Sequence, residues 1–191
     1  MDLILASTSP YRRELLERLH YPFRCAQPNT EETPLEGESA EPLAARLALD
    51  KALSVASSQR DALVIGSDQV ATVGGSILGK PGNHATAAGQ LARSSGQSVL
   101  FYTAVALVCL ETGFQCVHVE PFTVKFRQLS AKSIDNYLGI EQPYDCAGSF
   151  KCEGLGIALF ESLSGNDPTS LQGLPLIALT SMLNKAGLSV I

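Results

Sequence analysis

Apolar residues occur along this chain in two alternating patterns, short continuous runs and stripes with helical spacing. Continuous runs rich in β-branched residues are typical of strands buried on both faces, and they predict strands at residues 2–6, 22–27, 61–73, 76–79, 97–111, 115–127 and 157–165. Helical spacing and capping residues predict helices at about residues 9–20, 39–57, 83–94, 130–138 and 174–187. This order contains both βα crossovers and a hairpin, which indicates an α/β fold with a mixed sheet.

The start of the first predicted helix carries two adjacent arginines, Arg12 and Arg13. A helix N-terminus has partial positive charge, so cations are mildly disfavoured there. One interpretation is that both side chains are solvated. The other is that the free N–H groups of the turn, the guanidinium groups and the hydroxyls of Ser7, Thr8 and Ser9 bind a phosphate. The combination of a strand, a hydroxyl-rich turn and an arginine favours phosphate.

Lys51 is a second position that the hydrophobic pattern does not explain. On a helical wheel it falls in the middle of the apolar stripe formed by Leu43, Leu47 and Val55. A lysine avoids such a position unless its stem snorkels to solvent or its ammonium group has an anionic partner. Both interpretations stay open from the pattern alone.

Asp68 is the third such position, because it directly follows the apolar run ALVIG. In α/β proteins ligands bind beyond the carboxyl ends of strands, and a carboxylate there is a candidate catalytic group. The alternative is an aspartate in a turn, but Val70 and Val73 continue the strand pattern and weaken it.

Composition limits the possible partners. The chain has 191 residues, enough for one domain spanning 1–191, and its formal net charge is −5. An acidic protein is a poor general binder of nucleic acid, and the longest apolar run, 12 residues from Val99 to Leu110, is too short to cross a membrane. The start does not resemble a signal peptide. Five cysteines without CxxC spacing predict structural thiols in a reduced, cytoplasmic setting.

The charged candidates have a common chemical meaning. Several cations together with a few carboxylates suit a polyphosphate with a divalent metal such as Mg²⁺, since the cations offset phosphate charge and the carboxylates hold the metal or activate water. Lys80 in GKP and Glu31-Glu32 in the acidic loop carry little weight alone. The chain lacks the GxxxxGK[ST] pattern of a P-loop.

Several motifs, in order, resemble the Maf family of nucleoside triphosphate pyrophosphatases: LASTSPYRRELL, EE in the next loop, RLALDKA, GSDQV, GKP, FYTAVAL and CAGSFKCEGLG. The resemblance implies a two-lobed α/β fold with an elongated mixed sheet flanked by helices and a central active-site cleft. It implies metal-dependent (Mg or Mn) cleavage between the α and β phosphates, giving a monophosphate and pyrophosphate. The resemblance assigns phosphate binding to Ser7, Arg12, Lys51 and Lys80, metal binding to Glu32 and Asp68, and proton acceptance from water to Asp68. Arg13 falls outside the match.

Three positions, Tyr11, Gln69 and Glu153, depart from the common pattern and resemble the branch that acts on 7-methyl-GTP. N7 methylation makes the purine cationic, so a tyrosine face gains cation–π attraction and a carboxylate can accept from guanine N–H groups. The alternative is that Glu153 faces solvent and Tyr11 packs between lobes.

Other hypotheses of function remain at this stage. The chain could prefer dTTP or UTP, could be a phosphatase that releases orthophosphate, or could be a non-catalytic nucleotide-binding regulator of cell division. The pair Glu32 and Asp68 favours an enzyme, because a simple phosphate binder gains nothing from carboxylates near phosphates. The expected partner is a small nucleotide, without nucleic acid or membrane, and the chain could form a homodimer.

Overall fold

The computed structural model describes residues 1–191, and these divide into two compact units. Unit 1 consists of Met1–Gln69, Thr103–Glu120 and Asp167–Ile191, and unit 2 consists of Val70–Tyr102 and Pro121–Asn166. Three long strands contribute residues to both units.

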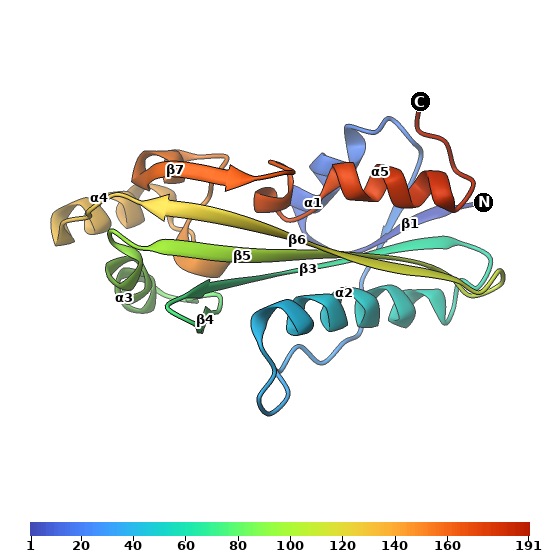
Figure 1. Ribbon diagram of the computed structural model, residues 1–191, viewed down its shortest axis with the longest axis horizontal. Helices are drawn as coiled ribbons and strands as arrows, with labels where there is room; N and C mark the ends of the chain where they lie inside the picture. Colours follow the sequence, from blue (N-terminus) through green and yellow to red (C-terminus); the bar gives the residue numbers. More distant parts are fainter. The chain divides into compact units, whose positions relative to one another are not determined.

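The structure is mixed α/β, as the sequence pattern predicts (Figure 1). The helices are α1 Pro10–Glu17, α2 Ala40–Ala56, α3 His84–Ser94, α4 Ala131–Glu141 and α5 Leu176–Lys185. The strands are β1 Leu3–Ala6, β2 Arg24–Ala26, β3 Leu63–Val73, β4 Ser76–Leu78, β5 Ser98–Cys109, β6 Phe114–Phe126 and β7 Phe160–Gly165. The sheet order is β2-β1-β3-β5-β6-β7, with β4 on β3, and it contains both parallel and antiparallel pairs.

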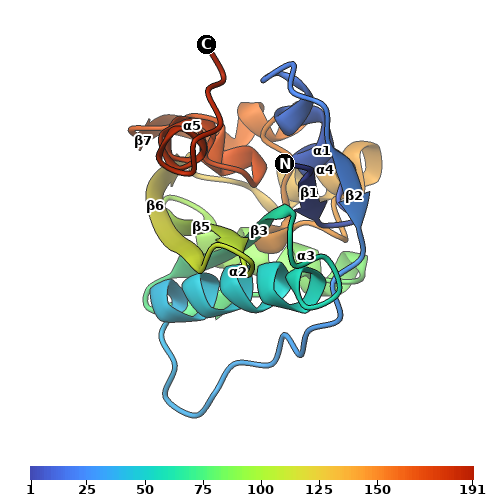
Figure 2. The same cartoon turned by 90° about the vertical axis from the view of Figure 1, so that its right-hand side faces the viewer.

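Unit 1 is layered, with α2 on one face of its strands and α5 on the other (Figure 2). Alternate β1 residues face opposite sides: Leu3 and Leu5 belong to the core formed with α1 and α5, whereas Ile4, equally buried, does not. Both faces of β1 are therefore covered, which explains its continuous apolar run.

Unit 2 has an aromatic core. Phe101, Phe126, Phe150 and Phe160 pack edge to face, with ring centroids 4.8 to 5.6 Å apart. Such edge-to-face pairs are the arrangement that the ring quadrupole favours. The rings come from β5, β6, β7 and the loop after α4, so they bind the elements of this unit together.

Several predicted boundaries are wrong: α4, for example, ends at Glu141 instead of about Leu138. Two of these differences have a clear cause in the backbone. The first helix ends at Glu17 instead of His20, because the backbone of His20 takes a left-handed conformation with φ of 52°. Residues Ile157–Leu159, predicted as strand, belong to the 3₁₀ helix Leu155–Leu159. The N–H groups of Gly154 and Gly156 both donate to the Lys151 carbonyl and turn the chain there.

The five cysteines lie in different environments. All five cysteines are free thiols, and Cys109 is buried in the core of unit 1. Cys25, by contrast, is exposed on β2. Among the helices, none combines the length and apolar character needed to cross a membrane.

Candidate active site

The turn between β1 and α1 presents hydroxyl groups in an ordered arrangement. The buried Ser7 Oγ accepts a hydrogen bond from the Ser9 N–H at 3.1 Å, and Ser9 Oγ caps α1 by accepting from the Arg12 N–H. Pro10 follows as the first helical residue, where its lack of an N–H has no cost. The Ser7 hydroxyl proton has no acceptor in the protein, so Ser7 can donate to a ligand.

The two adjacent arginines have different environments, which answers the question that their position raises. Arg12 is half-buried, and its Nε donates to the Gly173 carbonyl at 2.8 Å while its Nη atoms make no hydrogen bond within the protein. Arg13 is exposed and pairs with Glu17 one helical turn later, at 3.0 Å. Arg12 therefore keeps N–H donors for an anion, whereas Arg13 makes an ordinary surface pair.

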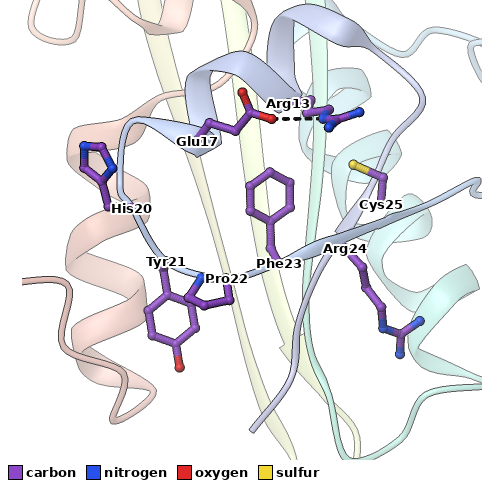
Figure 3. Close-up of a pocket in the computed structure, with 8 residues that line it drawn as sticks. All are labelled: Arg13, Glu17, His20, Tyr21, Pro22, Phe23, Arg24 and Cys25. Carbon is purple, nitrogen blue, oxygen red and sulfur yellow. Dashed lines mark hydrogen bonds and ion pairs between the residues drawn. The ribbon is translucent and has the colours of Figure 1, made fainter.

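Arg13 borders a surface pocket of about 520 Å³, which Figure 3 shows with Arg13 turned toward Glu17. The pocket is lined by Arg13, Glu17, His20, Tyr21, Pro22, Phe23, Arg24 and Cys25. The Arg24 guanidinium donates to Gln59, so both arginines of the pocket already have partners. The pocket contains none of the candidate site residues.

Lys51 has two anionic partners. Its Nζ lies 2.6 Å from Asp68 Oδ1 and 2.7 Å from Glu32 Oε1, and its side chain is only 8% exposed. An ammonium group so buried is stable only when paired, so the position of Lys51 in an apolar stripe is explained by these carboxylates instead of by snorkelling. Asp68 Oδ2 has no protein partner and is not sealed from solvent.

Gly66 allows α2 to approach β3 closely enough for the Lys51–Asp68 contact. A Cβ at Gly66 would lie 2.1 Å from the Ala48 carbonyl oxygen and 2.7 Å from the Ala52 nitrogen. Because Lys51 precedes Ala52 on α2 and Asp68 lies two residues after Gly66 on β3, this packing sets the distance between the ammonium and carboxylate groups.

The charges of unit 1 balance at this site. Burial lowers the pKa of Arg12, and the carboxylates of Asp68 and Glu32 act in the opposite direction by favouring its charged form. Arg12 stays protonated in any case. Two cations, Arg12 and Lys51, thus face two carboxylates, so a polyphosphate would bring excess negative charge that a further cation must offset.

Glu32 reaches Lys51 from the acidic loop before α2, and two side chains of α2, Ser54 and Arg46, hold this loop. The Asn29 N–H donates to Ser54 Oγ at 2.9 Å. Arg46 donates to the Thr33 carbonyl and binds both carboxylate oxygens of Glu38 at 2.7 Å each. Bidentate pairs of this kind fix geometry as well as supplying energy.

The Arg46–Glu38 pair predicts an acid-dependent loss of stability. The Arg46 hydrogen bonds, helped by the Leu35 N–H, lower the pKa of Glu38 from 4.5 to about 2. A carboxylate with a lowered pKa stabilises the fold fully above its unfolded-state pKa, and this contribution disappears as pH falls toward the folded-state value. The melting temperature of Glu38→Gln should therefore lie below that of the wild type at pH 7, with the difference closing between pH 4.5 and 2.

A matched control for this measurement is Glu36→Gln, because Glu36 lies in the same loop and has no ion-pair partner. The melting temperature of that variant should follow the wild type at every pH. A Glu38→Gln difference that persists unchanged at pH 2 would contradict the assigned pair.

The side-chain orientation of Gln69 is fixed by its neighbours. Its Nε2 lies 2.9 Å from the Ser170 carbonyl, 3.1 Å from the Leu171 carbonyl and 2.9 Å from Thr103 Oγ1, which itself donates to Ser170. These acceptors take the amide N–H groups, so only Oε1 of Gln69 remains to contact a ligand, as an acceptor.

Tyr11, on the first turn of α1, is half-buried.

Lys80 and Glu153 belong to unit 2, and both are exposed. Lys80 lies between β4 and α3, where the Gly82 N–H donates to the Tyr144 carbonyl. Glu153 lies in a loop held by Glu141, which accepts from the Leu155 N–H at 2.8 Å. Unit 1 brings together Arg12, Glu32, Lys51 and Asp68. Ser7 directly follows β1, and Gln69 lies on the neighbouring parallel strand β3.

Sequence reasoning missed two residues that hold this arrangement, Ser67 and Gly173. The fully buried Ser67 hydroxyl lies within hydrogen-bonding distance of the Ala104 and Gly173 carbonyls. The only sequence signal for Gly173 is the Gly-Leu-Pro punctuation before the last helix, and it carries no information about the partner, which lies 161 residues away at Arg12.

The donor set suits a divalent ion bound jointly with substrate. No group of three or more His, Cys, Asp or Glu side chains lies together, so the protein alone provides no complete metal cage. Mg²⁺ is typically held by one or two carboxylates together with substrate phosphates and water. Glu32 and Asp68, with the free Oδ2 of Asp68, fit that pattern.

The fold and the site define an α/β protein with a charged cluster formed by residues of α1, α2, β3 and the loop before α2, next to the carboxyl end of β1; Asp68 itself lies within β3 and not beyond its end. The family model described as "Maf-like protein" matches residues 2–186. A 7-methyl-GTP pyrophosphatase from Pseudoalteromonas atlantica is 58% identical over 190 residues, covering 100% of this chain and 97% of that protein. One of the same name from Polaromonas sp. is 56% identical over 98% of this chain and 86% of that protein. The chain belongs to the Maf family.

Among solved structures, the Staphylococcus aureus Ham1 protein is a distant match. It has a TM-score of 0.48 and 13% sequence identity, over 66% of this chain and 72% of that one. This likeness is too remote to indicate a function.

Proposed function

We propose that this protein is a nucleoside triphosphate pyrophosphatase that cleaves between the α and β phosphates and prefers 7-methyl-GTP. The relatives named 7-methyl-GTP pyrophosphatase, at 58% and 56% identity, support the activity and the substrate. One structural observation carries the proposal. Lys51 holds Asp68 through one carboxylate oxygen, and the other oxygen is available to accept a proton. Arg12, in the same unit, has Nη–H groups that make no hydrogen bond within the protein and can donate to phosphate.

The residues of unit 1 supply the steps of an in-line hydrolysis. Water attacks the α-phosphorus, its proton passes to Asp68 Oδ2, and the bond from the α-phosphorus to the bridging oxygen breaks so that pyrophosphate leaves. Lys51 fixes the Asp68 carboxylate through Oδ1. Arg12 and Ser7 donate to phosphate oxygens and stabilise the developing charge. A divalent ion, Mg²⁺ or Mn²⁺, would offset phosphate charge when bound at Glu32 and Asp68.

A product assay tests the activity. GTP, 7-methyl-GTP, dTTP, UTP, CTP and ATP are incubated with Mg²⁺ or Mn²⁺, and pyrophosphate and orthophosphate are measured separately. Pyrophosphate chiefly from 7-methyl-GTP is the expected result. Pyrophosphate chiefly from dTTP or UTP would overturn the substrate preference, and orthophosphate would overturn the cleavage position. Binding without any product would favour a non-catalytic regulator.

Base recognition by Glu153 gives a separate prediction. A carboxylate that accepts from guanine N–H groups and faces a cationic ring makes charge-assisted hydrogen bonds. Hydrogen bonds to charged groups contribute about 1.5–3 kcal/mol, so Glu153→Gln should lower the ratio of kcat/KM for 7-methyl-GTP over GTP by roughly tenfold or more. The exposed Glu161 on β7 offers the control Glu161→Gln, which should leave the ratio unchanged. Equal losses on both nucleotides would exclude a base-reading role.

A further inference from the structure

The segment between β7 and α5 is organised around one buried carboxylate, Asp167, which is 2% exposed. Its Oδ1 accepts from the Thr169 N–H at 2.9 Å and from Thr169 Oγ1 at 2.6 Å. Its Oδ2 accepts from the Ile177 N–H, in the first turn of α5, at 2.8 Å. Every contact of this carboxylate therefore serves the chain between residues 167 and 177, and none of them is with a cation.

Thr169 connects this carboxylate to the backbone at the C-terminal end of the segment, at Leu174 and Leu176. Its Oγ1 accepts from the Leu176 N–H at 2.9 Å and lies 2.9 Å from the Leu174 carbonyl. Gly173, which precedes Leu174 in the chain, has a backbone φ of 111°, a conformation that favours glycine. The direction of the Gly173 carbonyl is thus set by the peptides that Thr169 holds and by a backbone conformation that other residues rarely adopt.

The Gly173 carbonyl is the only hydrogen-bond partner of the Arg12 side chain within the protein. It accepts from Arg12 Nε at 2.8 Å and lies 2.9 Å from Ser67 Oγ. Because a guanidinium group is planar, one hydrogen bond at Nε also orients the Nη donors. The same segment supplies the Ser170 and Leu171 carbonyls that orient Gln69. One loop therefore positions candidate site residues on both α1 and β3.

We propose that Asp167 and Thr169 are positioning residues, which orient Arg12 for phosphate binding through the Gly173 carbonyl. The proposal rests on the phosphate-binding role of Arg12 in the proposed function. Neither residue contacts the substrate. They fix the direction of the Gly173 carbonyl, and this carbonyl orients the Arg12 guanidinium group.

The test measures the affinity of the full chain for inorganic pyrophosphate by titration calorimetry, which does not require turnover. Thr169→Val keeps the side-chain shape and removes the hydroxyl, and it should weaken binding about tenfold, while Thr169→Ser should restore it. Thr112→Val is the matched control, since the Thr112 hydroxyl makes similar backbone contacts in the β5–β6 turn of unit 1. It should bind pyrophosphate like the wild type.

A double-mutant cycle with Arg12→Ala separates positioning from general loss of stability. If Thr169 acts through Arg12, Thr169→Val should cause no further weakening in the Arg12→Ala background. The same tenfold loss in that background, or unchanged binding by Thr169→Val alone, would overturn the proposal. If Thr169→Val does not fold, Asp167→Asn serves in its place, because the amide nitrogen cannot accept from the Ile177 N–H while one oxygen remains for Thr169.

The outcomes also distinguish this proposal from the proposed function. If the wild type binds pyrophosphate but releases none from any nucleotide, the proposed hydrolase activity is wrong. The double-mutant cycle still tests the positioning role in that case, because it measures only binding. A wild type that binds no pyrophosphate would overturn the positioning role. Normal hydrolysis with an additive cycle would refute the positioning role alone.

Discussion

Asp68→Asn is expected to lower kcat by about 10²–10⁴-fold while leaving nucleotide affinity nearly unchanged. The amide has the shape of the carboxylate and can keep one oxygen toward Lys51, where Asp68 Oδ1 now lies at 2.6 Å. Its nitrogen would then occupy the place of Oδ2 and could not accept a proton from water. Single-turnover kinetics and binding of a non-hydrolysable α,β-methylene nucleotide measure the two effects separately.

The control for Asp68→Asn is Asp61→Asn, an exposed aspartate just before β3 with no ion-pair partner. That variant should have normal kcat. Near-normal kcat in Asp68→Asn itself would remove Asp68 from the role of proton acceptor. A fall in melting temperature of many degrees would show instead that the Lys51 pair is chiefly structural, because an unpaired buried ammonium group destabilises the fold.

Gly66→Ala is expected to destabilise the protein by about 1–3 kcal/mol or more and to abolish most activity. The added methyl would lie 2.1 Å from the Ala48 carbonyl oxygen, a backbone atom that cannot move without shifting α2. Because α2 carries Lys51, that shift lengthens the contact with Asp68. Urea unfolding gives the change in the free energy of unfolding, and the product assay gives the change in activity.

Gly89→Ala is the matched control for Gly66→Ala. Gly89 lies within α3, where a Cβ would meet no atom within 4 Å, so alanine should leave stability unchanged or raise it by about 0.5–1 kcal/mol. An unchanged free energy of unfolding in Gly66→Ala would contradict the close packing of α2 on β3.

Much of the local structure could be predicted from the sequence because the signals are local. The N-cap hydrogen bonds of Ser9, Asn83 and Ser130 are present as the capping pattern predicts. The end of α1 could not be predicted from a glycine signal, since the left-handed residue there is His20. The 3₁₀ turn before β7 depends on two N–H groups that converge on one carbonyl, a tertiary detail that an apolar run does not encode.

The sequence by itself determined that Lys51 and Asp68 are exceptional, because each breaks the hydrophobic pattern of its own element. It did not determine that they contact each other, which follows from the packing of α2 against Gly66. Arg12 and Arg13 are equivalent in a local pattern, yet one faces the Gly173 carbonyl and the other Glu17. Periodicity fixes which residues share a face, whereas partners far apart in the chain are set by strand order and helix packing, and so only the tertiary structure decided them.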